Sequence, residues 1–145
     1  SFMIQEQDIS IYAWKKPFFT ATCCLLILLL VNDTATRLYL YSAYPWIDIP
    51  MHFFGGFSVG LAIVGLLRIV YSGERYMKIS HFAYITIATL CVGLAWEVVE
   101  WYYNASVAFG GNFWFDTCKD LLMDTLGGIL SYICFRPQKK ELLTQ

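Results

Sequence analysis

Residues 50–71 read PMHFFGGFSVGLAIVGLLRIVY, a nearly unbroken apolar run in which Arg68 is the one permanently charged side chain. A membrane-spanning helix needs about 20 predominantly apolar residues, because the hydrocarbon core is about 30 Å thick and a helix rises about 1.5 Å per residue. This stretch therefore predicts a transmembrane helix. His52, near its start, is polar among Met, Phe and Gly, and it directs attention to the charged residues around it.

The composition of the whole chain agrees with a membrane location. Of its 145 residues, 58% are hydrophobic and only 14% are charged, against about 25% charged in soluble domains. Mean hydropathy is +0.54. We expect one integral membrane domain over residues 1–145. The five cysteines show no CxxC spacing and are expected to be apolar packing residues, and the tryptophans and tyrosines fit a membrane belt with no nucleic-acid role.

Three further apolar segments predict membrane helices, which gives an all-α fold with four transmembrane helices. They cover about residues 17–31, 79–103 and 115–135. The first is short enough to resemble the core of a signal peptide. However, Glu6 and Asp8 precede it and no cleavage site of small residues follows, so we expect it to be retained as a helix.

Between the first two helices, residues 32–49 alternate polar and aromatic side chains. This pattern is too polar to span a membrane and predicts an interfacial helix or loop. Asp33 and Arg37 are spaced for a local ion pair.

Basic residues are distributed unequally between the two sides of this arrangement. Only Arg37 and Lys119 fall on one side, whereas the other side holds Lys15, Lys16, Arg68, Arg75, Lys78, Arg136, Lys139 and Lys140. Cytoplasmic loops carry the excess of Lys and Arg, so both termini are predicted to be cytoplasmic in a multi-pass protein of a bacterial-type plasma membrane.

Acidic residues gather at the opposite, outer ends of three helices. Each ionisable group near the bilayer core costs at least about 2.5–3.5 kcal/mol on insertion scales. Their i,i+3 and i,i+4 spacing places each set on one helix face, and glycines, including Gly56 and Gly60, continue these faces. One pocket is therefore predicted from Asp48, His52, Glu97, Glu100, Asp116, Asp120 and Asp124.

An oxygen-rich set with one imidazole favours a divalent cation. Mg²⁺, Mn²⁺ or Ca²⁺ suit the carboxylates best, and Zn²⁺ or Fe²⁺ can bind through His52. For catalysis the candidates are His52, Glu97 and Asp120, and the only basic residues available to bind a substrate are Arg37 and Lys119. The alternatives are a protonated hydrogen-bonded network, helix caps at Asp48 and Asp116, and a solvated Glu100.

The same residues carry a resemblance to a known family. Asp48-x-x-x-His52-Phe53, Trp96-Glu97-x-x-Glu100-Trp101 and Asp116-x-x-x-Asp120 followed by Leu126-Gly127 resemble the YjdF-like (DUF2238) family of small bacterial inner-membrane proteins. More distantly, the order of motifs is similar to VanZ-like proteins, which are associated with glycopeptide resistance. The resemblance supports the pocket and leaves its function open.

Three functions fit these features. The first is a metal-dependent hydrolase or transferase acting on a lipid-linked or envelope substrate. The second is a proton- or cation-coupled transporter, which with so few helices requires a homo-oligomer. The third is a non-enzymatic protein that binds membrane lipids or a drug-like molecule around a structural cation. Open coordination positions favour the enzyme, a closed ligand shell favours the structural cation, and a polar path to the cytoplasm favours transport.

Overall fold

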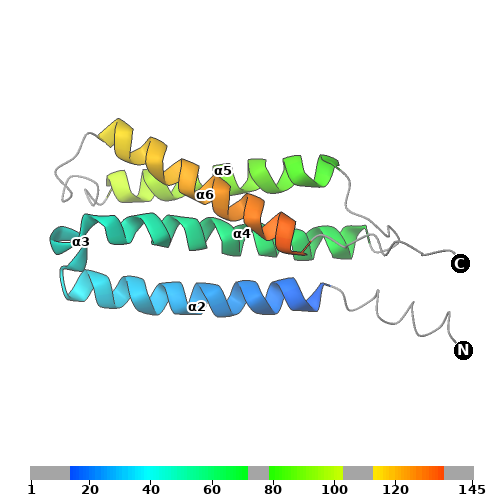
Figure 1. Ribbon diagram of the computed structural model, residues 1–145, viewed down its shortest axis with the longest axis horizontal. Coiled ribbons are helices and arrows are strands. Elements are labelled where there is room, and N and C mark those ends of the chain that lie inside the picture. Colours follow the sequence, from blue (N-terminus) through cyan, green and yellow to red (C-terminus); the bar gives the residue numbers. More distant parts are fainter. Residues whose placement is uncertain (1–13, 72–78, 103–112, 136–145) are drawn as a thin grey trace, which may run out of the picture.

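The computed structural model describes residues 14–71, 79–102 and 113–135, and the regular secondary structure within these ranges is helical throughout. Four long helices lie alongside one another, as Figure 1 shows. They are α2 (Lys15–Arg37), α4 (Asp48–Val70), α5 (Ile79–Tyr102) and α6 (Phe113–Phe135), and two short helices, the α-helix α3 (Leu40–Ala43) and the 3-10 helix η1 (Pro45–Ile47), join α2 to α4. The predicted all-α class is confirmed.

Three of the helical segments are long and apolar enough to cross a membrane: Lys15–Arg37, Pro45–Val70 and Ser80–Tyr102. The chain is thus a membrane protein with at least three such helices in the described residues. α6 does not reach the same apolarity, because every stretch of 18 residues within it contains Lys119, Asp120 and Asp124. The fourth span therefore stays a prediction, and the side chains that prevent its confirmation are those of the predicted pocket.

The first helix extends further than its apolar run. Its last residue is Arg37 and not residue 31, so residues 32–37 of the predicted interfacial helix or loop are helical and continuous with α2. The i,i+4 ion pair between Arg37 Nε and Asp33 Oδ2, at 2.8 Å, stabilises this last turn. α2 then ends where Tyr39 adopts a left-handed conformation with φ of 55°.

Helix α4 is the centre of the bundle and packs against α2, α5 and α6. The α4–α6 contact is close because glycines occupy it. A Cβ atom at Gly56 would lie 2.5 Å from Cα of Asp124, and one at Gly127 would lie 2.6 Å from the backbone nitrogen of Phe57. The predicted glycine contacts are therefore confirmed, and they bring the acidic face of α6 against His52.

The two ends of the bundle differ in chemistry. One end joins the end of α2, the start of α4, the end of α5 and the start of α6, with α3 beside them (Figure 1). The opposite end has an apolar core of Val64, Leu67 and Ile85. The topology thus places every predicted pocket helix with its acidic end on the same side.

Candidate functional site

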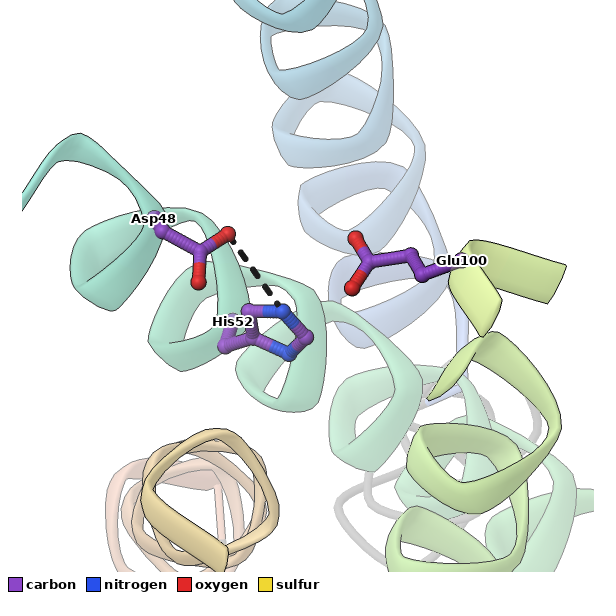
Figure 2. Close-up of side chains that lie close together, drawn as sticks. All are labelled: Asp48, His52 and Glu100. Carbon is purple, nitrogen blue, oxygen red and sulfur yellow. Dashed lines mark ion pairs between the residues drawn. The ribbon is translucent and has the colours of Figure 1, made fainter. Parts of the chain in front are cut away.

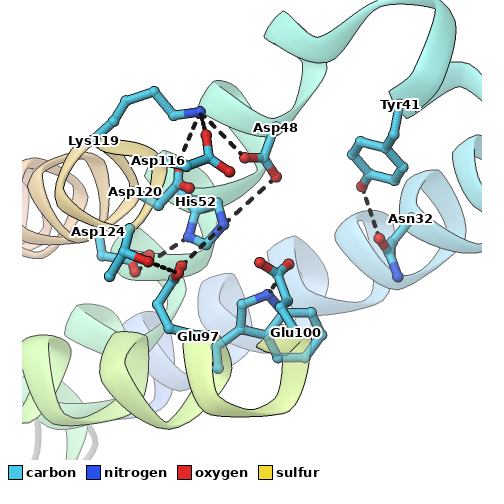
Figure 3. Close-up of polar contacts among 12 residues, drawn as sticks. Asn32, Tyr41, Asp48, His52, Glu97, Glu100, Asp116, Lys119, Asp120 and Asp124 are labelled. Atoms are coloured by element: carbon cyan, nitrogen blue, oxygen red, sulfur yellow. Dashed lines mark hydrogen bonds and ion pairs between the residues drawn. The ribbon is translucent and has the colours of Figure 1, made fainter. Parts of the chain in front are cut away.

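The acidic side chains of three helices meet at this end. Asp48, His52 and Glu100 lie close together (Figure 2), and residues of α6 complete the group (Figure 3). Five members are at most 7% exposed: Asp48, His52, Glu97, Asp120 and Asp124. The structure therefore brings together all seven predicted pocket residues with Lys119, and we call these eight residues the acidic cluster.

Arg37 does not join the acidic cluster. Its Nε bonds both carboxylate oxygens of Asp33, at 2.9 and 2.8 Å, and its side chain is 75% exposed. The hypothesis that Arg37 binds a substrate together with Lys119 is not supported by this placement, since the local pair in α2 takes up its charge.

His52 is the centre of the acidic cluster. Its Nδ1 lies 3.3 Å from Oδ2 of Asp124, and its Nε2 lies 3.6 Å from Oδ1 of Asp48 and 4.0 Å from Oε1 of Glu97. When Nδ1 carries the proton of the neutral ring and donates a hydrogen bond to Asp124, the lone pair of Nε2 faces the other two carboxylates. A carboxylate behind one ring nitrogen is the usual way in which a metal-binding histidine is oriented.

Two acidic side chains next to His52 have buried oxygens without a hydrogen-bond partner among the described residues. These atoms are Oε1 of Glu97 and both carboxylate oxygens of Asp120. The other oxygen of Glu97 accepts a 2.7 Å hydrogen bond from Oγ1 of Thr117, which fixes the carboxylate with Oε1 toward His52. An unsatisfied buried acceptor costs about 1–3 kcal/mol, and more when it is charged. Oδ1 of Asp120 has the ammonium group of Lys119 at 3.3 Å as a counter-charge. Oε1 of Glu97 and Oδ2 of Asp120 are therefore the atoms that most need a ligand or a proton.

The donor atoms of His52, Glu97 and Asp120 lie within 4.8 Å of one another. Three ligands bound to one cation at about 2.0–2.2 Å lie about 3–4 Å from one another. These side chains would therefore have to move closer together to coordinate one ion. The ligand atoms of two further groups also lie within 4.8 Å of one another: Asp48 with His52 and Glu100, and Asp48 with Asp116 and Asp120.

Lys119 serves the outer part of the acidic cluster. Its Nζ lies 2.6 Å from Asp116, 3.3 Å from Asp120 and 3.5 Å from Asp48. Lys119 and Asp116 thus form a local i,i+3 ion pair within α6. Asp48 follows the N-cap residue Ile47, and this helix start has no side-chain capping bond, so the alternative of Asp48 as a cap was wrong.

Glu100 lies at the mouth of a cavity of about 210 Å³ between α2, α4 and α5. It accepts a 2.7 Å hydrogen bond from Nε1 of Trp96, and it is partly exposed, so solvation by water is only part of its environment. Across the mouth, the hydroxyl of Tyr41 donates to Oδ1 of Asn32 at 2.7 Å. Burial raises the pKa of Tyr41 to about 12, and the charges of Asp48 and Glu100 add to this shift.

The sequence analysis missed several polar partners in this region. Thr117 had a usable signal, because it shares a face of α6 with Asp120 and Asp124 at i,i+3 and i,i+7. The pairing of Asn32 with Tyr41 could not be found from the sequence, since the two residues come together only because the chain turns after α2. The cavity itself also depends on how three helices pack.

Comparison with known proteins agrees with the motifs. A family model described as "Predicted membrane protein (DUF2238)" matches residues 9–141, almost the whole chain. The chain belongs to this family. No curated protein and no solved structure matches it. The YjdF-like resemblance is thus confirmed, and the more distant VanZ-like resemblance stays a prediction.

The description of the DUF2238 family identifies a membrane protein and names no activity. The acidic cluster is therefore the feature of this chain that indicates what chemistry is possible. One imidazole nitrogen and two carboxylates are a donor set that accepts Mg²⁺, Mn²⁺, Zn²⁺ or Fe²⁺. Three protein ligands also leave coordination positions for water or a substrate, as in catalytic metal sites.

Proposed function

We propose that this DUF2238 chain binds a divalent cation through His52, Glu97 and Asp120 and uses it to hydrolyse or transfer a group of a lipid-linked or envelope substrate. The observation that carries the proposal is that Oε1 of Glu97 and Oδ2 of Asp120 are buried with no hydrogen-bond partner among the described residues, whereas Oδ1 of Asp120 has Lys119 as a counter-charge. A cation would satisfy these oxygens and offset their mutual repulsion. The side chains of His52, Glu97 and Asp120 are between 1% and 6% exposed, so bulk water has little access to their ligand atoms.

The neighbouring residues support distinct roles around such a cation. Asp124 would orient His52, and Thr117 would orient Glu97, through the contacts at 3.3 and 2.7 Å. The cation would polarise a substrate oxygen and lower the pKa of a bound water. A carboxylate beside it, Asp48 or Glu100, would then accept a proton.

The outer surface of α6 supports a fourth membrane span. Its charged residues in the acidic cluster face the other helices, whereas the side chains exposed on its outside are apolar: Leu122, Leu126, Leu130 and Ile133. A helix of this kind can cross the bilayer with its polar face covered by protein. Together with the excess of Lys and Arg at the other end, this favours a plasma-membrane protein with cytoplasmic termini and the acidic cluster at the external leaflet.

The packing opposite the acidic cluster supports an enzyme over a transporter. There Val64, Leu67 and Ile85 form an apolar core. Of the buried polar side chains described in that half, Ser131 donates to a backbone carbonyl of its own helix and His81 contacts the ring of Tyr71. Between the two ends, the buried hydroxyls of Ser58 and Thr89 donate to backbone carbonyls of their own helices. Neither residue therefore continues the acidic cluster toward the apolar end.

Elemental analysis of the purified protein tests the cation site. We expect about one divalent metal ion per chain after exposure to Mn²⁺ or Zn²⁺ and removal of the excess, and loss of that ion in Glu97→Gln. Asp33→Asn is the matched control, because it removes an exposed carboxylate outside the acidic cluster and should leave the metal content unchanged. Equal metal in the wild type and Glu97→Gln would overturn the site.

A second measurement separates an enzyme from a structural cation. Proton relaxation of water around the Mn²⁺-loaded protein reports whether the ion retains exchangeable water. The enzyme requires such water, since three protein ligands leave positions open. A bound ion without exchangeable water would favour the structural role and overturn the proposed catalysis.

A further inference from the structure

The cavity between α2, α4 and α5 combines a polar end with an apolar interior. Its polar end is formed by four residues of the acidic cluster together with Tyr41 and Asn32, and its interior is lined chiefly by Leu25, Leu28, Val59 and Val92. The four are Asp48, His52, Glu100 and Asp124. Of the three residues proposed for the cation, only His52 lines it. The cavity is thus a second feature of the molecule, adjacent to the cation site and not identical with it.

The length of the cavity matches one leaflet of a bilayer. On α4 it extends from Asp48 to Val59, and on α5 from Glu100 to Thr89. Each distance is about 16 Å at about 1.5 Å per residue, or about half of a hydrocarbon core about 30 Å thick. Since the polar end lies at the end of the bundle, the cavity runs in the direction of a lipid chain, with its polar end where a head group would be.

The cavity is accessible from the side of the bundle. α2 and α5 each pack against α4, and they pack far less against each other. Leu25, Leu29 and Val92, which line the cavity, are 42%, 64% and 49% exposed. A volume of about 210 Å³ corresponds to roughly seven water molecules at about 30 Å³ each, enough for part of one chain, with the remainder in the opening between α2 and α5.

Charge selects the head group that fits the polar end. Asp48, Glu100 and Asp124 contribute carboxylates to the cavity wall, and among the described lining residues only His52 can carry a positive charge. The rings of Tyr41 and Trp96 also line this end, and aromatic faces attract ammonium groups. An anionic head would meet repulsion here, whereas an ammonium group would find both carboxylates and aromatic rings.

We infer that this cavity binds one apolar chain of a membrane amphiphile whose amine head group is held at Glu100. This goes beyond the proposed cation site, because the binding needs neither a bound metal nor the side chains of Glu97 and Asp120. The other possible occupants, an anionic lipid and non-specific annular lipid, are outcomes of the test below.

Photolabelling in a neutral detergent tests the inference. The probes are a long-chain primary amine and a fatty acid of the same length, each with a diazirine in the chain. We expect the amine to label the protein at least about tenfold more, a difference of about 1.4 kcal/mol, at peptides of α2, α4 and α5. Glu100→Gln should remove most of this preference. Equal labelling by both probes, or preference for the fatty acid, would overturn the inference.

Two tryptophan variants of α5 test the place of binding. Val92→Trp puts a large ring into the cavity, and Val98→Trp is the matched control, because Val98 is 62% exposed and is not among the lining residues. We expect at least about a tenfold loss of amine labelling in Val92→Trp only. Equal labelling of the two variants would show annular lipid and contradict the inference. Metal content in the wild type reports on the cation site separately, so either proposal can fail while the other stands.

Discussion

The two ends of the helical bundle are formed by the same four helices, but their buried side chains differ in polarity. At one end, Val64, Leu67 and Ile85 form an ordinary apolar core. At the other end, Glu97, Asp120 and Asp124 are buried nearly as deeply, although each brings a carboxylate. Apolar side chains need only a good fit, whereas buried carboxylates need hydrogen bonds, counter-charges or a cation. The comparison indicates that the apolar end is stable through packing alone, whereas the acidic end needs a cation, protons or counter-charges to be stable.

Glycines distinguish the two ends most strongly. A Cβ atom at Gly127 would meet the backbone of Phe53 and Phe57, which cannot move aside, whereas one at Gly65 would meet the ring of Phe18 at 2.7 Å. We expect Gly127→Ala to reduce the free energy of unfolding by about 1–3 kcal/mol and Gly65→Ala to reduce it less. Melting temperatures in detergent measure this. Equal losses would mean that α4 and α6 do not pack this closely.

Asp124 and Asp116 separate the buried from the outer part of the acidic cluster. Asp124→Asn should weaken cation binding about 10–100-fold, because it removes the carboxylate that orients His52. Asp116→Asn should change it little, since Asp116 pairs with Lys119 at 2.6 Å and its side chain is 24% exposed. Titration calorimetry with Mn²⁺ gives both affinities. A similar loss in both variants would contradict the role assigned to Asp124.

Thr117 should have a smaller effect of the same kind. Thr117→Val keeps the shape of the side chain and removes the hydrogen bond to Glu97, so we expect cation binding to weaken by about 0.5–1.5 kcal/mol, as for a typical intramolecular hydrogen bond, which is at most about tenfold in affinity. Thr125→Val is the control, because the Thr125 hydroxyl donates to the carbonyl of Leu121 in its own helix. If the two variants bind Mn²⁺ equally well, Thr117 does not position Glu97.

Arg37 should have the smallest effect. Its ion pair with Asp33 is exposed, and such pairs contribute about 0–1 kcal/mol. Arg37→Ala should therefore leave Mn²⁺ affinity unchanged and melting temperature nearly so. A clear loss of Mn²⁺ affinity would place Arg37 at the site, against the geometry described above.

The sequence was sufficient for the helices and for the meeting of their acidic ends. Continuous apolar runs predict spans, and i,i+3 and i,i+4 spacing predicts which side chains share a face. The end of α2 was missed because the pair of Asp33 and Arg37 extends the helix beyond its apolar run. Helix α6 was harder to classify, since its buried charges lower the hydropathy by which spans are recognised.

The individual contacts that each residue makes inside the acidic cluster could not be predicted from the sequence. Spacing places Asp48 and His52 on one face, and it does not show that Lys119 of α6 approaches Asp48 at 3.5 Å. Nor does it show that Thr117 donates a hydrogen bond to Oε2 of Glu97, while Oε1 has no hydrogen-bond partner among the described residues. Such contacts depend on the distance and rotation between helices, which small residues at the interfaces determine. The sequence therefore supplied the members of the site, and the packing assigns each a role.

Thermal unfolding with and without a cation tests the central claim most directly. An ion that binds only the folded protein stabilises it by about 2.7 kcal/mol at one hundred times its dissociation constant. We predict that Mn²⁺, Mg²⁺ or Zn²⁺ raises the melting temperature of the detergent-solubilised protein, that a chelator reverses the shift, and that Glu97→Gln abolishes it while Asp33→Asn retains it. If no cation shifts the transition of the wild type, or if Glu97→Gln responds equally, the buried carboxylates are protonated or paired without metal, and the proposed cation site is wrong.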